Sequence, residues 1–268
     1  MSEKSSPYDE IYGNFENEVL ARVRAEAFGE DLGQNSWLTG SEYRHFLRLL
    51  NLNSEMRLLD VCCGSGGPAL FAARETGCRV TGIDQSESGI AEARRQSMPE
   101  DQNADFVVAD ASQQLAYKDA TFDAIISIDA VNHLNNRLEV FREFHRVVRA
   151  EGRLLFTDPI TVTGILTTAE IAIRSHIGSM NFTPPGENER LLNLAGFEVL
   201  SVADVTDNLV NTSKRRFEAR QKYSTELMTI EGESVFVALQ DFLRTAHQLA
   251  DERRLSRFVF LARKRPSA

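Results

Sequence analysis

The stretch LLDVCCGSGGPAL, residues 58–70, decides the fold class of this chain. An apolar run meets an acid, Asp60, and passes through two cysteines into a glycine turn followed by Pro68. Proline is tolerated in the first helical turn, where the backbone N–H has no partner within the helix. The pattern therefore predicts a buried strand, a tight turn and a helix. On its own it fits a nucleotide-binding turn, a thiol site or a turn without a ligand.

From residue 57 onward, short apolar runs alternate with segments of helical spacing. Strands that are apolar on both faces and separated by helices belong to a parallel sheet that is covered on each side. The sequence therefore predicts an α/β fold with a Rossmann-like, doubly wound and mostly parallel sheet of seven strands. The predicted strands span residues 57–61, 78–84, 104–110, 122–129, 152–158, 197–205 and 256–264.

Segments outside this alternation predict N-terminal helices and helical cap insertions. Residues 1–54 are expected to form an N-terminal helical lid, because residues 12–23 and 43–50 carry apolar side chains at helical spacing. Thr39 or Ser41 would cap the second of these helices. The remainder, residues 55–268, is expected to be one domain with cap insertions at about 160–186 and 206–254, the second with two helical stretches.

Composition and charge favour a small ligand. A formal net charge of -9 over 268 residues gives no basic surface for nucleic acid. No apolar run approaches the roughly 18 residues of a membrane span, and the start MSEKSSPYDE has no signal-peptide core, so a cytoplasmic protein is expected. Three cysteines without CxxC or Cys/His spacing predict no disulfide framework and no metal site. A homodimer is possible.

The carboxyl ends of the parallel strands should meet at one crevice, where a ligand binds. Asp60 and the glycine turn follow the first strand, and Gly64 and Gly66 would let the backbone approach a ligand beside a helix N-terminus. Asp84 ends the second strand, 18 residues after Gly66. Near this spacing a carboxylate accepts hydrogen bonds from both hydroxyls of a ribose. Asp84 could instead cap the next helix, and the glycines could form a turn without a ligand.

The third strand ends at Asp110, which could accept a hydrogen bond from an adenine amino group while the N–H of Ala111 serves a ring nitrogen. These parts fit two cofactors. The glycine turn satisfies GxGxx[GA], so a nicotinamide dinucleotide is an alternative. Against it, the carboxylate of Asp60 would face phosphates, although it would suit the ammonium of an amino acid. S-adenosylmethionine, which has an adenine, a ribose and an amino-acid tail, fits better.

Together these segments resemble the class I S-adenosylmethionine-dependent methyltransferases. LLDVCCGSGG is similar to their first motif, an acid followed by GxGxG, with Cys62 where the first glycine usually falls. GIDQS, VVADA, FDAIISIDAVNHL and FREFHRVVRAEGRLLFTDP resemble the segments that follow, over about residues 55–160. The resemblance implies S-adenosylmethionine as cofactor and S-adenosylhomocysteine as product. Later segments, SIDAVNHL, TDP, HIGSM and RFVFLARK, resemble the small-molecule branch that holds sarcosine and dimethylglycine N-methyltransferases.

Further donor contacts are expected from the N-terminal segment and from the strand ends. Gln34 and Trp37 would lie close to the donor side of the crevice, although plain packing is the alternative for Trp37. A sulfonium beside an aromatic face is favoured by roughly 0.5–2 kcal/mol. Gln85 directly follows the second predicted strand, and Ile128 lies near the end of the fourth. Both are expected to bind the cofactor.

Asp129 and His133 follow the fourth strand, where the acceptor should meet the methyl group. A hydroxyl acceptor must lose its proton, and histidine, with an unperturbed pKa near 6.5, is the natural base. For an amine acceptor, Asp129 could bind or orient the neutral amine. His133 could equally be a packed histidine that contacts the donor. Asp158, before Pro159, could face the pocket or start a turn.

The sequence therefore predicts an enzyme, an S-adenosylmethionine-dependent methyltransferase that acts on the nitrogen or oxygen of a small metabolite. Two alternatives stay open at this point. One is an NAD(P)-dependent oxidoreductase, and the other is a non-catalytic nucleotide-binding module that keeps the fold.

Overall fold

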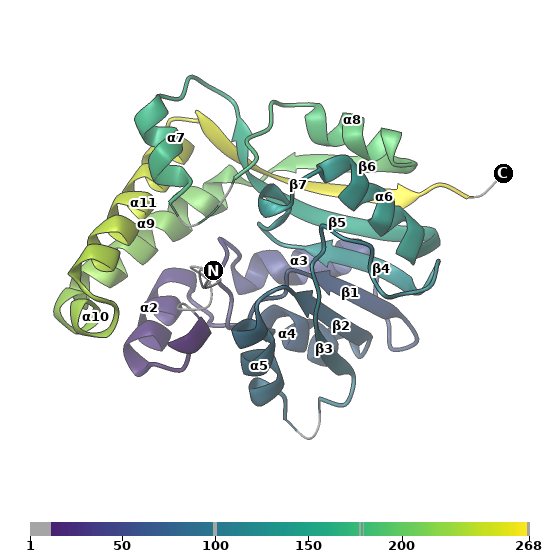
Figure 1. The fold of residues 1–268 in the computed structure, drawn as a ribbon, viewed down its shortest axis with the longest axis horizontal. Coiled ribbons are helices and arrows are strands. Elements are labelled where there is room, and N and C mark those ends of the chain that lie inside the picture. Colours follow the sequence, from purple (N-terminus) through teal and green to yellow (C-terminus); the bar gives the residue numbers. More distant parts are fainter. Residues whose placement is uncertain (1–11, 99–100, 177, 179, 267–268) are drawn as a thin grey trace, which may run out of the picture.

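A seven-stranded sheet in the order β3-β2-β1-β4-β5-β7-β6 forms the centre of the molecule (Figure 1). The structure is a computed structural model that describes residues 12–98, 101–176, 178 and 180–266. Parallel pairing joins β1 to β2 and β4, β2 to β3, and β4 to β5, whereas β7 runs antiparallel to β5 and β6. The predicted mostly parallel, seven-stranded α/β sheet is confirmed. Its strands are β1 (Arg57–Val61), β2 (Arg79–Asp84), β3 (Ala104–Val108), β4 (Phe122–Ser127), β5 (Val148–Val162), β6 (Phe197–Asp204) and β7 (Leu255–Lys264).

Both faces of the central strands are buried, which is why these strands read as continuous apolar runs. In β1, Leu59 and Val61 pack into one core and Leu58 into the other, on the opposite face. The Leu58 side is covered by α3 (Gly40–Leu50), α4 (Gly67–Thr76) and α5 (Glu87–Gln96). The Leu59 side is covered by α6 (Arg137–Val147) and α8 (Glu187–Leu194). The sheet thus carries helices on both faces.

Strand β5 is longer than the sequence predicts. It continues four residues past Asp158, to Val162, because Thr161 and Val162 pair with residues of β7. Strand β5 thus includes residues 160–162 of the segment predicted as the first insertion, and α7 (Thr168–Arg174) follows a capping box at Thr167.

The N-terminal segment contains α2 (Glu18–Phe28) and α3. The helical spacing predicted from residue 12 to 23 is interrupted, because residues 14–17 form a turn and the Oδ1 atom of Asn17 accepts a hydrogen bond from the N–H of Val19 at the start of α2. Thr39, one of the two predicted caps, is the N-cap of α3.

The second insertion holds three helices where the sequence predicted two: α9 (Thr206–Lys222), α10 (Ser224–Glu231) and α11 (Glu233–Asp251). Breaks at Tyr223 and Gly232 separate them, and Gly232 has φ +83°, which favours glycine. These helices lie beside the sheet together with α2 and α7 (Figure 1). Val23 of α2 packs with Leu227 of α10 and Phe236 of α11 in one small core.

In the part of the chain that the structure describes, no helix combines the length and the apolar character needed to cross a bilayer.

Asp158 faces the protein core, so the expectation that it could face the ligand pocket is wrong. Its Oδ2 atom accepts hydrogen bonds from Nη1 of Arg137 (2.7 Å) and from Nδ2 of Asn188 (3.0 Å). The side chain of Asp158 is 0% exposed and that of Arg137 is 5% exposed. This ion pair joins β5 to α6 and, through Asn188, to α8.

Replacing Asp158 with alanine should lower the free energy of unfolding by about 3–5 kcal/mol, because the charge of Arg137 would be left buried without its carboxylate. Urea denaturation measures the change. The control is Glu139→Ala, which breaks the Arg142 pair, in which both side chains are 52% exposed. That change should cost less than about 1 kcal/mol, and equal losses in the two variants would contradict a buried, structural ion pair.

Candidate active site

The turn after β1 adopts a left-handed backbone at three positions. Cys62, Gly64 and Gly66 have φ angles of +61°, +56° and +77°. Cysteine rarely adopts this conformation, which costs a residue with a side chain of order 1–3 kcal/mol. Cys62 therefore takes the backbone conformation suited to the glycine that usually stands at this place.

Much of the space left by these glycines is filled by protein. A Cβ atom on Gly66 would overlap the ring of Phe106, and one on Gly64 would overlap the hydroxyl of Tyr12. A Cβ atom on Gly67 would likewise overlap the carbonyl oxygen of Leu32. The N-terminal loop therefore lies directly over the start of α4. Gly64 lines the cavity next to the turn, whereas Gly66 serves the packing of the turn against β3 and α5.

Two adjoining cavities lie at the carboxyl ends of the strands. The first, which we call the turn cavity, lies between residues 33–36 and the turn residues 60–65. The second, the strand-end cavity, is the larger of the two and follows the ends of β2, β3 and β4. Tyr12, Asn35, Cys62 and Ile128 line both cavities.

Asp84 connects the glycine turn to the end of β2. Its Oδ2 atom accepts a hydrogen bond from the N–H of Gly64 (2.9 Å), and its Oδ1 atom accepts one from the N–H of Ser86 (2.9 Å). The side chain that caps α5 is Ser86, whose Oγ atom accepts from the N–H of Gly89. The alternative reading of Asp84 as the helix cap is therefore wrong.

The strand-end cavity brings together five of the residues predicted from the sequence: Asp84, Gln85, Asp110, Ala111 and Ile128. Asp110 and Gln85 are exposed, while Ala111 is buried. The Oδ1 atom of Asp110 accepts a hydrogen bond from the N–H of Ser112 (2.8 Å), which fixes the carboxylate at the cavity wall. These residues come from three consecutive strand ends, as the sequence predicted.

Asp60 lines the turn cavity and is only 4% exposed. No side chain or backbone group of the described residues donates a hydrogen bond to its carboxyl group. Burial, and then the nearby carboxylate of Asp84, raises the pKa of Asp60 to about 8. A cation that enters the cavity would favour the ionised form of this carboxyl group and bind to it.

The two adjacent cysteines do not form a reactive thiol site. Burial, followed by the charges of Asp84, Asp60 and Asp110, raises the pKa of Cys62 well above its ordinary value. Burial and the charges of Asp60 and Asp84 raise the pKa of Cys63 in the same direction. Because the thiolate is the nucleophilic form, both thiols are unreactive at neutral pH.

Gln34 braces its own loop and lines the turn cavity. Its Oε1 atom accepts from the N–H of Leu32 (2.7 Å), and its Nε2 atom donates to the carbonyls of Glu30 and Leu38 (both 3.1 Å). The neighbouring Asn35 was not predicted, yet it lines both cavities. A lone asparagine in a polar loop carries no pattern that would single it out.

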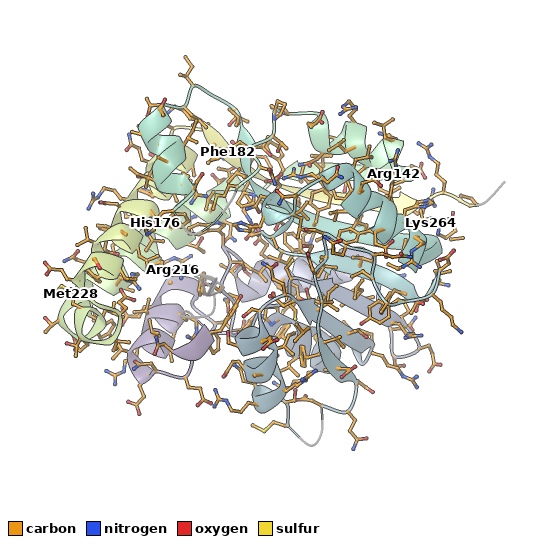
Figure 2. All side chains as sticks on the ribbon, viewed as in Figure 1. Arg142, His176, Phe182, Arg216, Met228 and Lys264 are labelled. Carbon is orange, nitrogen blue, oxygen red and sulfur yellow. The ribbon has the colours of Figure 1, made fainter. Side chains whose placement is uncertain are left out.

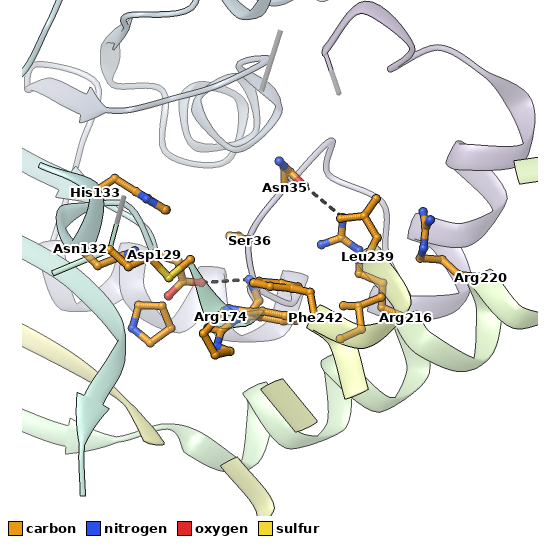
Figure 3. A pocket seen from close by; sticks show the side chains of 14 residues that line it. Asn35, Ser36, Asp129, Asn132, His133, Arg174, Arg216, Arg220, Leu239 and Phe242 are labelled. Carbon is orange, nitrogen blue, oxygen red and sulfur yellow. Dashed lines mark hydrogen bonds between the residues drawn. The ribbon is translucent and has the colours of Figure 1, made fainter. Parts of the chain in front are cut away.

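A third cavity, which we call the cap cavity, lies between the N-terminal loop and the helical insertions (Figure 3). It is lined by residues 35–37, by Asp129, Asn132 and His133, and by side chains of α7, α9 and α11. Asn35 and Ser36 join it to the turn cavity, and Asp129 and His133 join it to the strand-end cavity. The three cavities meet at these four residues.

Trp37 lines the cap cavity and neither of the other two. Its ring stacks on that of Phe242 from α11, with centroids 6.1 Å apart and planes 14° from parallel. The structure thus brings Gln34 to the turn cavity but places Trp37 on the opposite side of the junction, apart from the other predicted cofactor residues.

Asp129 is held by three hydrogen bonds. Its Oδ1 atom accepts from Nε of Arg257 and from Oγ1 of Thr157 (both 2.7 Å), and its Oδ2 atom accepts from the backbone N–H of Trp37 (2.9 Å). Arg257 in turn donates to both carboxylate oxygens of Glu42, each at 2.8 Å. The carboxylate predicted to act on the acceptor therefore also fixes the N-terminal loop to the sheet.

His133 ends the short 3₁₀ helix η1 (Val131–His133) and is half-buried. It lines both the strand-end and the cap cavity, so it lies where the sequence predicted a base or a donor contact. Neither His45 nor His176 lines any of the three cavities.

Replacing Cys62 with valine should cost roughly 1–3 kcal/mol more than replacing it with glycine, because a β-branched side chain is strained at positive φ. Chemical denaturation of both variants measures the difference. The matched pair Cys63→Gly and Cys63→Val changes a neighbouring residue without a positive φ. A preference for valine over glycine at position 62 would contradict the left-handed conformation.

Comparison with known proteins gives a family match over the central strands. Residues 59–156 match the family model described as a methyltransferase domain. Phosphoethanolamine N-methyltransferase 3 of Arabidopsis thaliana is 29% identical over 190 residues, which cover 69% of this chain and 38% of that protein. Sarcosine/dimethylglycine N-methyltransferase of Halorhodospira halochloris is 33% identical over 165 residues, which cover 59% of this chain and 57% of that protein. The chain spans between about one third and three fifths of the length of such relatives.

Solved structures share the fold. Phosphoethanolamine N-methyltransferase 2 of Haemonchus contortus, in complex with S-adenosyl-L-methionine, superposes with a TM-score of 0.81 and 19% identity, covering 98% of this chain and 61% of that one. The cyclopropane synthase MmaA2 of Mycobacterium tuberculosis gives a TM-score of 0.79 and 18% identity, covering 98% and 100%. Residues 59–156 are thus similar to a methyltransferase domain, and the fold of the chain is shared with solved methyltransferase structures, one of them in complex with S-adenosyl-L-methionine.

Proposed function

We propose that this protein transfers the methyl group of S-adenosylmethionine to the nitrogen or oxygen of a small metabolite. The observation that carries the proposal is the meeting of three cavities at Asn35, Ser36, Asp129 and His133. Two of these cavities carry groups that suit the donor, and the third is bordered by helices α7, α9 and α11. A methyl group presented at the junction would face this third cavity.

The donor residues divide between two cavities. In the turn cavity, Asp60 would hold the α-ammonium group of the donor, because it is a buried carboxyl group that lacks a partner among the described residues. In the strand-end cavity, Asp84 would accept hydrogen bonds from the ribose hydroxyls. Asp110 and the N–H of Ala111 would serve the adenine. Tyr12, which lies over Gly64, would cover the connection between the two cavities.

When bound, S-adenosylmethionine supplies a positively charged sulfonium whose methyl group a nucleophile displaces in line. The protein's own residues contribute alignment and exclusion of water. His133 is placed to accept the proton of a hydroxyl acceptor, whereas a neutral amine needs no base. We assign Asp129 a positioning role, since Arg257, Thr157 and the N–H of Trp37 already occupy its two oxygens.

Two features argue against a nicotinamide dinucleotide. The loop at Leu32 packs over Gly67 at the start of α4, which is where a pyrophosphate would bind in the GxGxx[GA] reading. Asp60 lies beside the same turn, and its ionised form would repel phosphate. A non-catalytic module would bind the donor without turnover, so an activity measurement separates it from the proposal.

The names of relatives support a small methyl acceptor and do not decide whether its nitrogen or its oxygen is methylated. Phosphoethanolamine and sarcosine/dimethylglycine enzymes act on amines by name, and a relative from Amycolatopsis mediterranei is a 27-O-demethylrifamycin SV methyltransferase. The cytoplasmic location and the homodimer stay predictions from the sequence.

Calorimetry tests the donor assignment. The protein should bind S-adenosylmethionine and S-adenosylhomocysteine, and the variant Asp84→Ala should weaken both by about fivefold or more through lost ribose contacts and a loosened turn. The exposed acid Asp105, on β3, provides the control variant Asp105→Ala. Binding of NAD without either methionine derivative would overturn the proposal, and donor binding without release of S-adenosylhomocysteine from a metabolite panel would favour the non-catalytic module.

Asp60→Asn should make the ligand-free protein more stable at pH 8 but not at pH 4. The pKa of Asp60 is about 8 in the fold and about 4 in an unfolded chain, so the unfolded chain ionises first and stability falls as pH rises between these values. Removing the carboxyl group removes this loss, which by linkage amounts to at most about 5 kcal/mol at pH 8.

Urea denaturation at pH 4, 6 and 8 measures the stability difference, with Asp105→Asn as the exposed control. The same Asp60→Asn variant should bind S-adenosylhomocysteine at least about tenfold more weakly, because the ammonium loses its charged partner. A stability difference that is independent of pH would show that Asp60 is not held protonated by its surroundings.

A further inference from the structure

The wall of the cap cavity carries more positive than negative groups. Among the described residues that line it, three are arginines, Arg174, Arg216 and Arg220, and one is an acid, Asp129. The carboxylate of Asp129 is paired with Arg257, which does not line the cavity. Asp129 is thus paired from behind the wall, as Arg220 is with Glu231, and guanidinium groups outnumber carboxylates among the residues that line the cavity.

The arginines are distributed along the cavity. Arg216 and Arg220 are four residues apart on α9 and so share one face of that helix. They lie at the side of the cavity away from Asp129 and His133 (Figure 3). Arg216 lies between α9 and the N-terminal segment (Figure 2), and its Nη2 atom donates to Oδ1 of Asn35 (3.2 Å). Arg220 forms an ion pair with Glu231.

Apolar groups occupy the wall between these two ends. Phe242 stacks on Trp37, and Leu239 and Leu243 extend the same side of α11. Arg174 is 1% exposed and lies over the ring of Phe242, with 4.4 Å between the guanidinium carbon and the ring centroid. The flat guanidinium group of Arg174 stacks on this ring and extends the surface that an aromatic or aliphatic group of a ligand could contact.

We propose that the methyl acceptor is an elongated organic anion, held with its carboxylate or phosphate group at Arg216 and Arg220. Its apolar middle would lie along Trp37 and Phe242, and its nucleophilic nitrogen or oxygen would reach the junction at His133. Guanidinium groups bind carboxylate and phosphate in the same planar, two-point geometry. This inference rests on the proposed methyltransferase function and adds the charge and the orientation of the substrate.

The test uses the only tryptophan, Trp37, as a reporter inside the cavity. Protein saturated with S-adenosylhomocysteine is titrated with benzoate, phenyl phosphate and the neutral benzamide, and the fluorescence of Trp37 is followed. The three probes share a phenyl ring and differ in their charged group. At least one of the anions should bind about tenfold more tightly than benzamide, and the comparison of the two anions distinguishes carboxylate from phosphate recognition.

Variants of α9 then locate the anion site. Arg216→Gln should remove most of the preference for anions over benzamide, whereas Arg216→Lys should keep part of it because the positive charge stays. The control is Arg215→Gln, a neighbouring exposed arginine that does not line the cavity. Circular dichroism of each variant checks that α9 is folded, and the lysine variant keeps the test valid if glutamine disturbs the helix.

Three outcomes would overturn the proposal: equal binding of benzamide and both anions, no fluorescence response to any probe, or an equal loss of preference in Arg215→Gln and Arg216→Gln. Each of these leaves the methyltransferase assignment intact as long as S-adenosylhomocysteine binds. Failure to bind S-adenosylhomocysteine would instead overturn the proposed function itself.

Discussion

The buried guanidinium of Arg257, held between Asp129 and Glu42, is the interaction on which the arrangement of the site depends. Its side chain is 0% exposed, and its two acidic partners are 4% and 11% exposed. The three residues come from β7, from the turn after β4 and from α3. Removing one member of such a group leaves a buried charge, which costs far more than a surface pair. The N-terminal segment is thereby fixed to the last strand of the sheet.

This network decides what Asp129 can do. Asp129 has φ +53°, an uncommon backbone conformation that is kept where the surroundings over-determine it. The carboxylate holds the backbone N–H of Trp37, so the position of the loop at residues 33–37 follows from the position of Asp129. That loop separates the turn cavity from the cap cavity and lies over the start of α4. The charge network therefore influences the shape of all three cavities, although Arg257 itself lines none of them.

The parts that the sequence predicted depend on neighbouring residues. Alternation of Leu58 and Leu59 between two cores, the cap at Thr39 and the acids at the ends of β2 and β3 are all visible within a few positions. The missed parts depend on contacts between distant residues. Trp37 meets Asp129 across 92 residues, and Asn35 meets Arg216 across 181. No local spacing encodes such pairs, which is why the contact of Trp37 with Asp129 was not foreseen and Asn35 and Arg216 were not singled out.

Two acids at the carboxyl end of the sheet differ in their hydrogen-bond and ion-pair partners. This difference indicates a structural role for one and a binding role for the other. The side chain of Asp129 is 4% exposed, and the whole residue Asp60 is 4% exposed. Asp129 is paired with Arg257 and accepts three hydrogen bonds, so its burial is compensated within the protein. Asp60 has no such compensation among the described residues, and its burial raises its pKa and opposes folding at neutral pH. An uncompensated carboxyl group of this kind is stabilised when a cationic ligand binds, so Asp60, rather than the more conspicuous Asp129, is the acid best suited to contact the donor.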